Sequence, residues 1–326
     1  MKKVILSGMR PTGKLHLGHL AGALDNWVKL QKEYQCFFMV ADWHALMSEY
    51  ENTSLLSENI IDNVVDWLSV GIDPKESVIF IQSKIPEHLN LHMIFSCLTP
   101  LGILERCPTY KEQLREVKTR DLNTYGFLGY PVLQAADILL YKADKVPVGR
   151  DQLPHLELTR EIARLFNNLY KKDIFPYPDA ILTQTPKLLG LDGRKMSKSY
   201  ANTINLSDPP QVITKKISTM FTDPKRIKLT DQGHPNSCNV FSYYTTFIPG
   251  MKDEVYSWCI AAKKGCTDCK KILAENIIDK ISPIQRKREE LCKDIGEVRK
   301  IILKGNNEAQ SLAAKTMKEV SKAVNI

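Results

Sequence analysis

The sequence predicts an α/β fold in which a doubly wound parallel sheet precedes a smaller, all-helical C-terminal domain. Through the first 200 residues, short continuous apolar runs alternate with segments of helical periodicity. Beyond about residue 206 only the helical pattern continues. Strands that are apolar throughout indicate a sheet covered by helices on both faces. The 326 residues are enough for two such domains.

The elements follow in order along the chain. The first half gives strands at 4–7, 36–41 and 77–82, with helices at 16–30 and 53–70 between them, then a helix at 131–141, a strand at 146–148 and a helix at 153–166. The last third gives helices at 208–220, 251–262, 269–281, 284–304 and 307–323. A Pro-Pro pair after Ser207-Asp places the junction near 200–210, which divides the chain into domains 1–205 and 206–326.

Composition excludes several classes of protein. Hydrophobic residues make up 43% and charged residues 25%, which is typical of a globular protein in water. No apolar run approaches the roughly 20 residues of a membrane span, and the N-terminal apolar stretch is too short for a signal peptide. We therefore expect a cytoplasmic protein without membrane association or disulfides.

Most of the positive charge lies in the last third of the chain. Residues 206–326 carry 21 basic and 14 acidic side chains, a net charge of +7 out of +8 for the whole chain. This excess favours a polyanionic partner, and a solvated lysine-rich surface explains it about equally well.

The loop after the first strand, from Arg10 to His19, has the features of a phosphate site. The carboxyl end of a strand in a doubly wound sheet opens into the ligand crevice, and a helix N-terminus there offers free N–H groups. Gly13 and Gly18 allow close approach, and His16 and His19 emerge on one side of the first turn. Two exposed or capping histidines are the alternative interpretation. The loop is not a Walker motif.

A second loop carries paired lysines, in Lys195-Met-Ser-Lys-Ser199. Two mobile ammonium groups that close on ATP would stabilise the charge left on pyrophosphate. A solvated basic turn is the alternative.

Four of the eight cysteines, Cys238, Cys259, Cys266 and Cys269, have the spacing C-x20-C-x6-C-x2-C. Four thiolates suit either zinc or a [4Fe–4S] cluster, and scattered buried thiols are the alternative. Cys36, Cys97 and Cys107 lie in apolar or mixed stretches and are interpreted as small core residues.

His16-Leu-Gly-His19 together with Lys195–Ser199 resembles the two signatures of class I aminoacyl-tRNA synthetases. Longer segments resemble the bacterial tryptophanyl-tRNA synthetase family over essentially the whole chain: residues 6–13, 130–141, 146–149, 151–152 and 155–160. The resemblance implies a Rossmann-like catalytic domain and a helical domain that binds the tRNA anticodon. It implies ATP-dependent activation of L-tryptophan to tryptophanyl-adenylate and transfer to tRNA(Trp), by a homodimer. A tyrosyl-tRNA synthetase, another adenylyltransferase with the same histidine loop, and a non-catalytic RNA-binding module are the alternatives.

The resemblance also implies roles for single residues. His16, His19, Lys195 and Lys198 would be the catalytic groups on the phosphates, with Mg²⁺ on the pyrophosphate. Asp137 would accept the indole N–H; pairing with Lys142 or capping a backbone group is its alternative role. Tryptophan would further contact Gln152 and Tyr130 through its amino group, and Leu6, Val146 and Val148 through its ring.

The ATP site implied by the resemblance comprises Arg10, Pro11, Thr12, Gly18, His19, Gly149, Arg150, Asp151, Leu189, Lys195, Met196, Ser197, Lys198 and Ser199. The chain departs from the family at Gly149-Arg-Asp-Gln152, where the family commonly has glutamate in place of Arg150. Either Arg150 points to solvent or the nucleotide contacts at this edge differ. For the cysteines, the resemblance favours [4Fe–4S] over zinc, inside a basic region with Lys263, Lys264, Lys270, Lys271, Arg286, Lys287 and Arg288 as candidate tRNA contacts.

Overall fold

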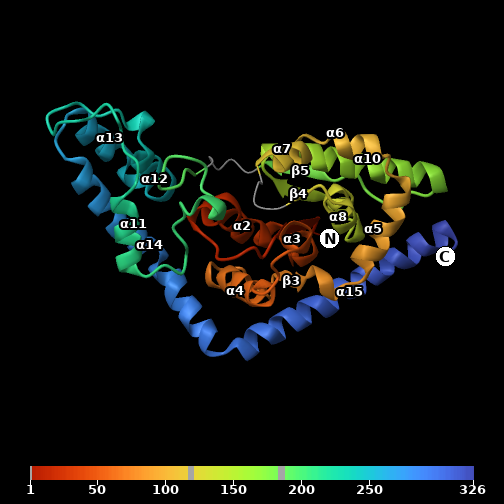
Figure 1. Ribbon diagram of the computed structural model, residues 1–326. Helices are drawn as coiled ribbons and strands as arrows, with labels where there is room; N and C mark the ends of the chain where they lie inside the picture. Colours follow the sequence, from red (N-terminus) through yellow and green to blue (C-terminus); the bar gives the residue numbers. More distant parts are fainter. Residues whose placement is uncertain (1, 117–120, 183–187) are drawn as a thin grey trace.

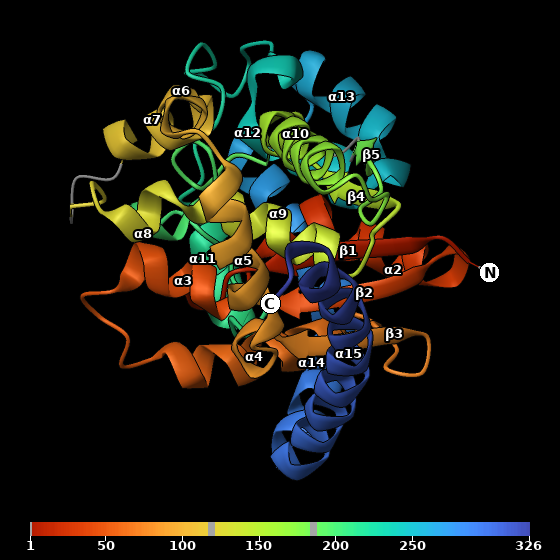
Figure 2. The ribbon, with the colours of Figure 1, turned by 90° about the vertical axis from the view of Figure 1, so that its right-hand side faces the viewer.

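The computed structural model describes residues 2–116, 121–182 and 188–326, and its centre is a five-stranded parallel sheet. The strands are β1 (Val4–Met9), β2 (Gln35–Val40), β3 (Ser77–Ile81), β4 (Lys145–Val148) and β5 (Asp179–Leu182). Their order is β3-β2-β1-β4-β5, and each neighbouring pair is parallel. Figure 2 shows this order as the strands descend from β5 at the top to β3. The predicted doubly wound sheet is confirmed.

Helices cover both faces of the sheet, which explains why the strands are apolar throughout. In β2, Cys36, Phe38 and Val40 join one buried cluster, while Phe37 and Met39 join the other. The first cluster includes side chains of α2 (Asp25–Glu33) and α4 (Leu56–Ser69). The second includes side chains of α5 (Glu87–Leu98), α9 (Tyr130–Leu140) and α10 (Leu153–Tyr170).

The helix predicted at 16–30 is divided into three pieces. A short α1 (Leu17–His19) leads into the π-helical turn η1 (Leu20–Leu24) and then into α2. Single π turns inside helices often accompany functional sites. The shorter elements around the sheet are α3 (Asp42–Glu49), η2 (Gln82–Lys84), α6 (Leu101–Arg106), α7 (Pro108–Glu116), α8 (Tyr125–Leu128), η3 (Arg150–Gln152) and η4 (Lys198–Tyr200).

The last third of the chain is helical, as predicted, within the residues described. It contains α11 (Pro210–Ser218), η5 (Pro235–Ser237), α12 (Asn239–Phe247), η6 (Pro249–Met251), α13 (Lys252–Ile260), α14 (Cys266–Lys293) and α15 (Ile295–Val324). The breaks differ from those expected. α14 continues through Pro283, with Ile277 and Ile281 buried on one side, and the chain turns instead at Asp294, whose side chain accepts from the backbone N–H of Glu297.

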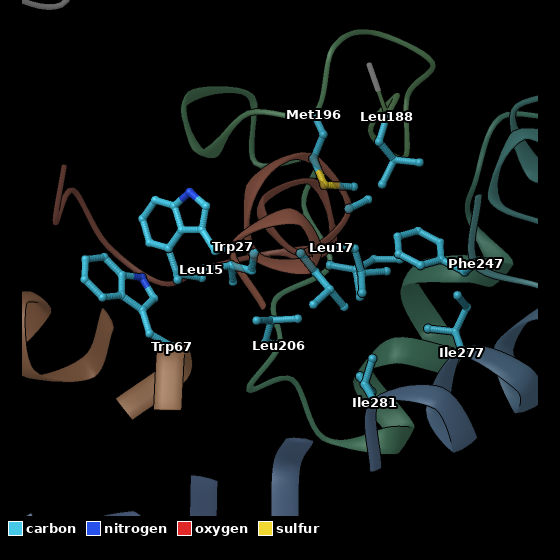
Figure 3. Close-up of a cluster of buried hydrophobic side chains, with 14 of the residues drawn as sticks. Leu15, Leu17, Trp27, Trp67, Leu188, Met196, Leu206, Phe247, Ile277 and Ile281 are labelled. Carbon is cyan, nitrogen blue, oxygen red and sulfur yellow. The ribbon is translucent and has the colours of Figure 1, made fainter. Parts of the chain in front are cut away.

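The first buried cluster continues from the sheet into the helical region. Figure 3 shows Leu17 near the side chains of Leu206, Phe247 and Ile277. These residues belong to one connected set that also contains Trp27 and Trp67 beside the sheet. The division of the chain at residues 205 and 206 stays a prediction.

The final helix, α15, returns to the sheet and covers its edge at β3 (Figure 1). Gly305 permits this contact, because a Cβ atom there would lie 1.9 Å from the carbonyl oxygen of Ile79. Asn306 Oδ1 accepts from the backbone N–H of Ile81 at 2.9 Å, on the side of β3 that faces no further strand. Within the described ranges, no helix is long and apolar enough to cross a bilayer.

Candidate active site

A cavity of about 380 Å³ opens where the strand order reverses, between β1 and β4. Ligand crevices in doubly wound sheets form at this point, beyond the carboxyl ends of the strands. Every residue predicted to contact tryptophan lines the cavity: Leu6, Tyr130, Asp137, Val146, Val148 and Gln152. Arg10 and Gly149, predicted to contact ATP, line it too.

Asp137 is a buried carboxylate held by three donors. His44 Nε2 lies 2.7 Å from Oδ2, and His88 Nδ1 lies 2.7 Å from Oδ1. Gln82 Nε2 donates to Oδ1 at 2.8 Å. Burial acts to raise the pKa of Asp137, but the bonds and charges of the two histidines outweigh it and hold that pKa below its ordinary value. Asp137 is therefore an ionised acceptor, and the alternative partner Lys142 pairs with Glu319 instead.

Tyr130 lies on the same helix, about two turns before Asp137, and its hydroxyl is also hydrogen-bonded. The hydroxyl donates to Thr109 Oγ1 at 3.3 Å and lies 3.3 Å from His155 Nε2. Burial raises the pKa of Tyr130 to about 12, so the phenol stays protonated near neutral pH. Gln152, the last residue of η3, also lines the cavity.

The histidine loop caps its own helix. His16 Nδ1 accepts from the backbone N–H of Gly18, and His19 Nδ1 accepts from that of His16, both at 3.1 Å. Burial, followed by the charge of Lys198, lowers the pKa of His16 to about 4; burial also lowers the pKa of His19. Both imidazoles are therefore neutral at pH 7, and each keeps Nε2–H as its donor. The predicted capping alternative is present, and it is compatible with donation to a phosphate.

The lysine loop reaches the histidine loop through Lys198. Its Nζ donates to the carbonyl oxygen of Gly13 at 2.7 Å. Burial, followed by the charge of Arg10, lowers the pKa of Lys198 to about 8. Met196 is buried against Gly18, where a Cβ atom would lie 3.4 Å from the Met196 sulfur. Figure 3 shows Met196 and Leu188 directed toward the first helices, whereas Lys195 is exposed.

The helical region fixes the backbone that leads into the lysine loop. Asn239 Nδ2 donates to the Gly190 carbonyl at 2.6 Å, and the Tyr243 hydroxyl donates to the Leu189 carbonyl at 2.7 Å. Inside the loop, Asn202 bonds to the backbone of Lys195 and Ser197 and to Asp192. Two residues of α12 therefore anchor the loop from outside, and Asn202 organises it from within.

The remaining predicted ATP residues lie around these two loops. The backbone N–H of Thr12 donates to the Arg10 carbonyl oxygen at 2.9 Å, and Pro11 between them is buried. The Arg150 and Asp151 side chains are exposed, and neither lines the cavity. The side chain of Ser199 lies outside the described residues. The ligand assigned to each of these residues stays a prediction.

The four cysteines of the helical region lie near one another as free thiols. Burial raises the pKa of Cys238, Cys259 and Cys269, and the charges of neighbouring cysteines in the set add to the effect. Yet among the residues that the structure describes, no group of three or more His, Cys, Asp or Glu side chains is arranged to hold a metal ion. The metal site predicted at Cys238, Cys259, Cys266 and Cys269 is not supported by this arrangement.

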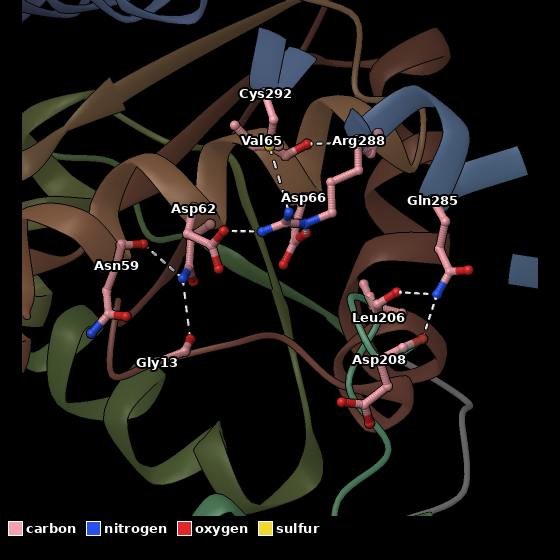
Figure 4. Close-up of polar contacts among 12 residues, drawn as sticks. Gly13, Asn59, Asp62, Val65, Asp66, Leu206, Asp208, Gln285, Arg288 and Cys292 are labelled. Carbon is pink, nitrogen blue, oxygen red and sulfur yellow. Dashed lines mark hydrogen bonds and ion pairs between the residues drawn. The ribbon is translucent and has the colours of Figure 1, made fainter. Parts of the chain in front are cut away.

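A polar network beneath the site was not anticipated from the sequence. Asn63 Nδ2 on α4 donates to the Gly13 carbonyl at 3.2 Å, the same oxygen that Lys198 contacts. Figure 4 shows Arg288 of α14 between Asp62 and Asp66 of α4. The first loop is thus connected through α4 to the helical region.

Comparisons with known proteins agree on one family. Residues 2–281 match the model of the class I tRNA synthetases (W and Y). The tryptophan–tRNA ligase of Thermotoga maritima is 51% identical over 325 residues, covering 99% of each chain. That of Aquifex aeolicus is 44% identical, with 99% of each chain covered. The crystal structure of tryptophanyl-tRNA synthetase from Campylobacter jejuni, complexed with ADP and tryptophan, gives a TM-score of 0.89 at 33% identity and covers 99% of this chain and 100% of that one.

Proposed function

The chain belongs to the class I tRNA synthetases for tryptophan and tyrosine, its reaction is the ATP-dependent joining of tryptophan to tRNA, and we propose that Asp137 selects the indole while the histidine and lysine loops act on ATP. The carboxylate of Asp137 is the observation that carries the proposal. It lines the cavity beside the apolar side chains of Val146 and Val148 and is kept ionised by His44 and His88.

Indole has a single polar group, an N–H donor, so its pocket needs one acceptor and apolar walls. Ionised Asp137 is an acceptor only, and Leu6, Val146 and Val148 supply walls. Phenylalanine would leave the acceptor unpaired, which sites of this kind reject strongly. An ionised carboxylate would also accept from a phenol hydroxyl, so the preference for tryptophan over the tyrosine alternative rests on the relatives and not on this contact.

The first half-reaction needs positioning and charge stabilisation rather than a protein nucleophile. The carboxylate oxygen of tryptophan bonds to the α-phosphorus of ATP, the bond to the β-phosphate bridging oxygen breaks, and pyrophosphate leaves. The Nε2–H groups of His16 and His19 would donate to phosphate oxygens, and Lys198 and Lys195 would balance the charge of pyrophosphate. Mg²⁺ would enter with the nucleotide, bound by phosphate oxygens. A terminal tRNA hydroxyl, the 2′-hydroxyl by the resemblance, then takes the acyl group.

The test first alters the carboxylate of Asp137 and then replaces the indole N–H of the substrate. Asp137→Asn should raise the KM for tryptophan sharply in pyrophosphate exchange and leave the KM for ATP unchanged. The benzothiophene analogue of tryptophan has sulfur in place of N–H, so its binding should change far less. Asp144→Asn, which alters an exposed carboxylate that accepts from Val4 N–H, is the control for a charge change alone. Equal losses for tryptophan and the analogue would remove Asp137 from indole recognition.

A [4Fe–4S] cluster, or zinc as second choice, remains our proposal for the four cysteines. The electrostatic interactions among the four thiols, which indicate that they lie near one another, support it together with their spacing in the sequence. The side chains would have to rearrange to coordinate it. Anaerobic purification followed by metal and sulfide analysis tests this. Iron and sulfide in equal amounts would support the cluster, and zinc alone would support a zinc site. The absence of both metals would refute a metal site.

We also propose a cytoplasmic homodimer that binds tRNA through its basic helical region. An apolar groove of about 300 Å³ lies between α3, α5 and α8, lined by Trp43, Leu46, Met47, Tyr50, Leu89, Thr124 and Gly126. Met93, Leu101 and Tyr125 expose large apolar surface on these elements or next to them. A second copy of the chain would cover them. Sedimentation velocity should show a dimer that Tyr125→Glu weakens, and a wild-type monomer would contradict the proposal.

A further inference from the structure

Four buried side chains meet next to the cavity, and of these only Tyr130 has a part in the function described so far. Cys107 and Thr109 lie at the start of α7, Tyr130 on α9 and His155 on α10; each is 8% exposed or less. Tyr130 and His155 line the cavity directly. The side chains come from three helices, so the fold rather than local sequence brings them together.

Their hydrogen bonds form a continuous chain. The Tyr130 hydroxyl donates to Thr109 Oγ1 at 3.3 Å, and Thr109 Oγ1 lies 2.7 Å from His155 Nε2. On the far side of the ring, His155 Nδ1 lies 3.7 Å from the Cys107 sulfur, which also lies 3.3 Å from Thr109 Oγ1. A tyrosine hydroxyl has one hydrogen, and here it points toward Thr109 Oγ1, with His155 Nε2 also 3.3 Å from the hydroxyl oxygen. The oxygen of Tyr130 therefore keeps its lone pairs for another partner.

We propose that Thr109 and His155 are positioning residues that hold the Tyr130 hydroxyl as an acceptor for the ammonium group of tryptophan. This inference rests on the proposed contact between Tyr130 and the substrate amino group. An ammonium group has three donors and no acceptor, so it can bind Tyr130 only if the hydroxyl hydrogen points elsewhere. Thr109 is the residue that takes this hydrogen, and His155 fixes the threonine rotamer.

Burial supports the same arrangement. Burial raises the pKa of Tyr130 to about 12, although the bond to Thr109 acts to lower it. The group is therefore a phenol, whose hydrogen must point somewhere, and not a phenolate that would accept from any direction. Buried polar groups bind best when their orientation is set in advance. Loss of the Thr109 hydroxyl should therefore weaken recognition of the substrate ammonium group selectively.

The experiment uses three ligands on the full-length enzyme, with affinities from isothermal titration calorimetry. L-Tryptophan and tryptamine carry the ammonium group, and indole-3-propionate lacks it. Thr109→Val keeps the side-chain shape and removes the hydroxyl. It should weaken tryptophan and tryptamine about tenfold, by similar factors, and leave indole-3-propionate unchanged. Thr109→Ser, which restores the hydroxyl, should recover most of the affinity. His155→Asn keeps a polar group near Cys107 but removes Nε2, and should give the same pattern more weakly.

Two results would overturn the proposal. An equal loss for all three ligands would mean that Thr109 only maintains the pocket shape, and no loss for any ligand would mean that Tyr130 needs no such support. Tyr130→Phe separates this inference from the function beneath it. If that variant weakens tryptophan and tryptamine but Thr109→Val does not, the positioning role alone is wrong. If Tyr130→Phe spares tryptamine, the Tyr130 contact is wrong as well.

Discussion

Lys198 is a partly buried cation whose charge is sensitive to pH in the working range of the enzyme. Burial disfavours its charged form and lowers its pKa to about 8. If the ammonium is required, kcat/KM for ATP in pyrophosphate exchange should be constant below that pH and fall about tenfold per unit above it, since this quantity reports the free enzyme. Arginine stays charged throughout, so Lys198→Arg should move the fall to higher pH.

Controls for this profile come from the same loop. Lys195→Arg changes an exposed lysine and should not move the pH of the fall. Lys198→Ala should lower kcat by roughly 10²–10³-fold. A wild-type profile that stays flat to about pH 9.5 would contradict the assignment.

Short motifs in the sequence indicated single residues of the candidate site, but not the partners that the structure places beside them. Lys198 and Asp137 each lie in a segment whose local pattern resembles a known family. His44 and His88, which hold Asp137 ionised, are 93 and 49 positions away along the chain. Only the strand order, with β2 and β3 ending at the same edge of the sheet, brings them to Asp137. The chain has seven histidines, and the presence of His44 and His88 among them was the one sequence signal of their contact with Asp137.

At the scale of elements, α12 connects the helical region to the lysine loop, and its own sequence did not indicate a helix. Residues 239–247 read Asn-Val-Phe-Ser-Tyr-Tyr-Thr-Thr-Phe, which is rich in aromatic and β-branched types that favour strands. Burial of Val240, Phe241, Tyr243, Tyr244 and Phe247 stabilises the helix instead. Tertiary packing overrides local propensity here, as it does where α14 passes through Pro283.

Two adjacent tyrosines of α12 allow a matched test of this connection. Tyr243→Phe removes the bond to the Leu189 carbonyl, whereas Tyr244→Phe removes a bond of equal length, 2.7 Å, to the Cys269 carbonyl in α14. Each should cost about 1–3 kcal/mol of unfolding free energy, because a carbonyl loses its donor. Only Tyr243→Phe should also lower kcat of pyrophosphate exchange, with the KM for tryptophan unchanged. Equal kcat values in the two variants would show that α12 does not set the lysine loop.

At the scale of the whole molecule, the two regions are joined by more than the backbone near residue 205. One buried cluster extends from the sheet into α11, α12 and α14, and α15 returns to cover β3. Sequence patterns predicted two successive domains because helical periodicity does not show what a helix packs against. Gly305 illustrates this: it lies between the helices expected at 284–304 and 307–323, but it is the point of close approach between the continuous α15 and Ile79.

The polar counterpart of this junction is Arg288 on α14, which contacts Asp62 and donates through Nε to Asp66 at 2.8 Å (Figure 4). Asp66 is buried, which raises its pKa to about 7, so above that pH the removal of its cation leaves an uncompensated charge in a region of low dielectric. Arg288→Met keeps the apolar stem and should reduce the free energy of unfolding by about 3–5 kcal/mol in urea titrations. Adding Asp66→Asn, which removes the orphaned charge, should restore part of this loss.

The neighbouring residue supplies the matched control. Lys287 pairs with Glu290 at 3.2 Å on the exposed side of the same helix, and Lys287→Met should cost less than about 1 kcal/mol. Because α4 also carries Asn63, which donates to the Gly13 carbonyl beside Lys198, Arg288→Met should raise the KM for ATP while Lys287→Met does not. Equal stability losses in the two variants would mean that α14 and α4 are held together by apolar packing alone. A lower stability with an unchanged KM for ATP would mean that this junction stabilises the molecule without acting on the histidine loop.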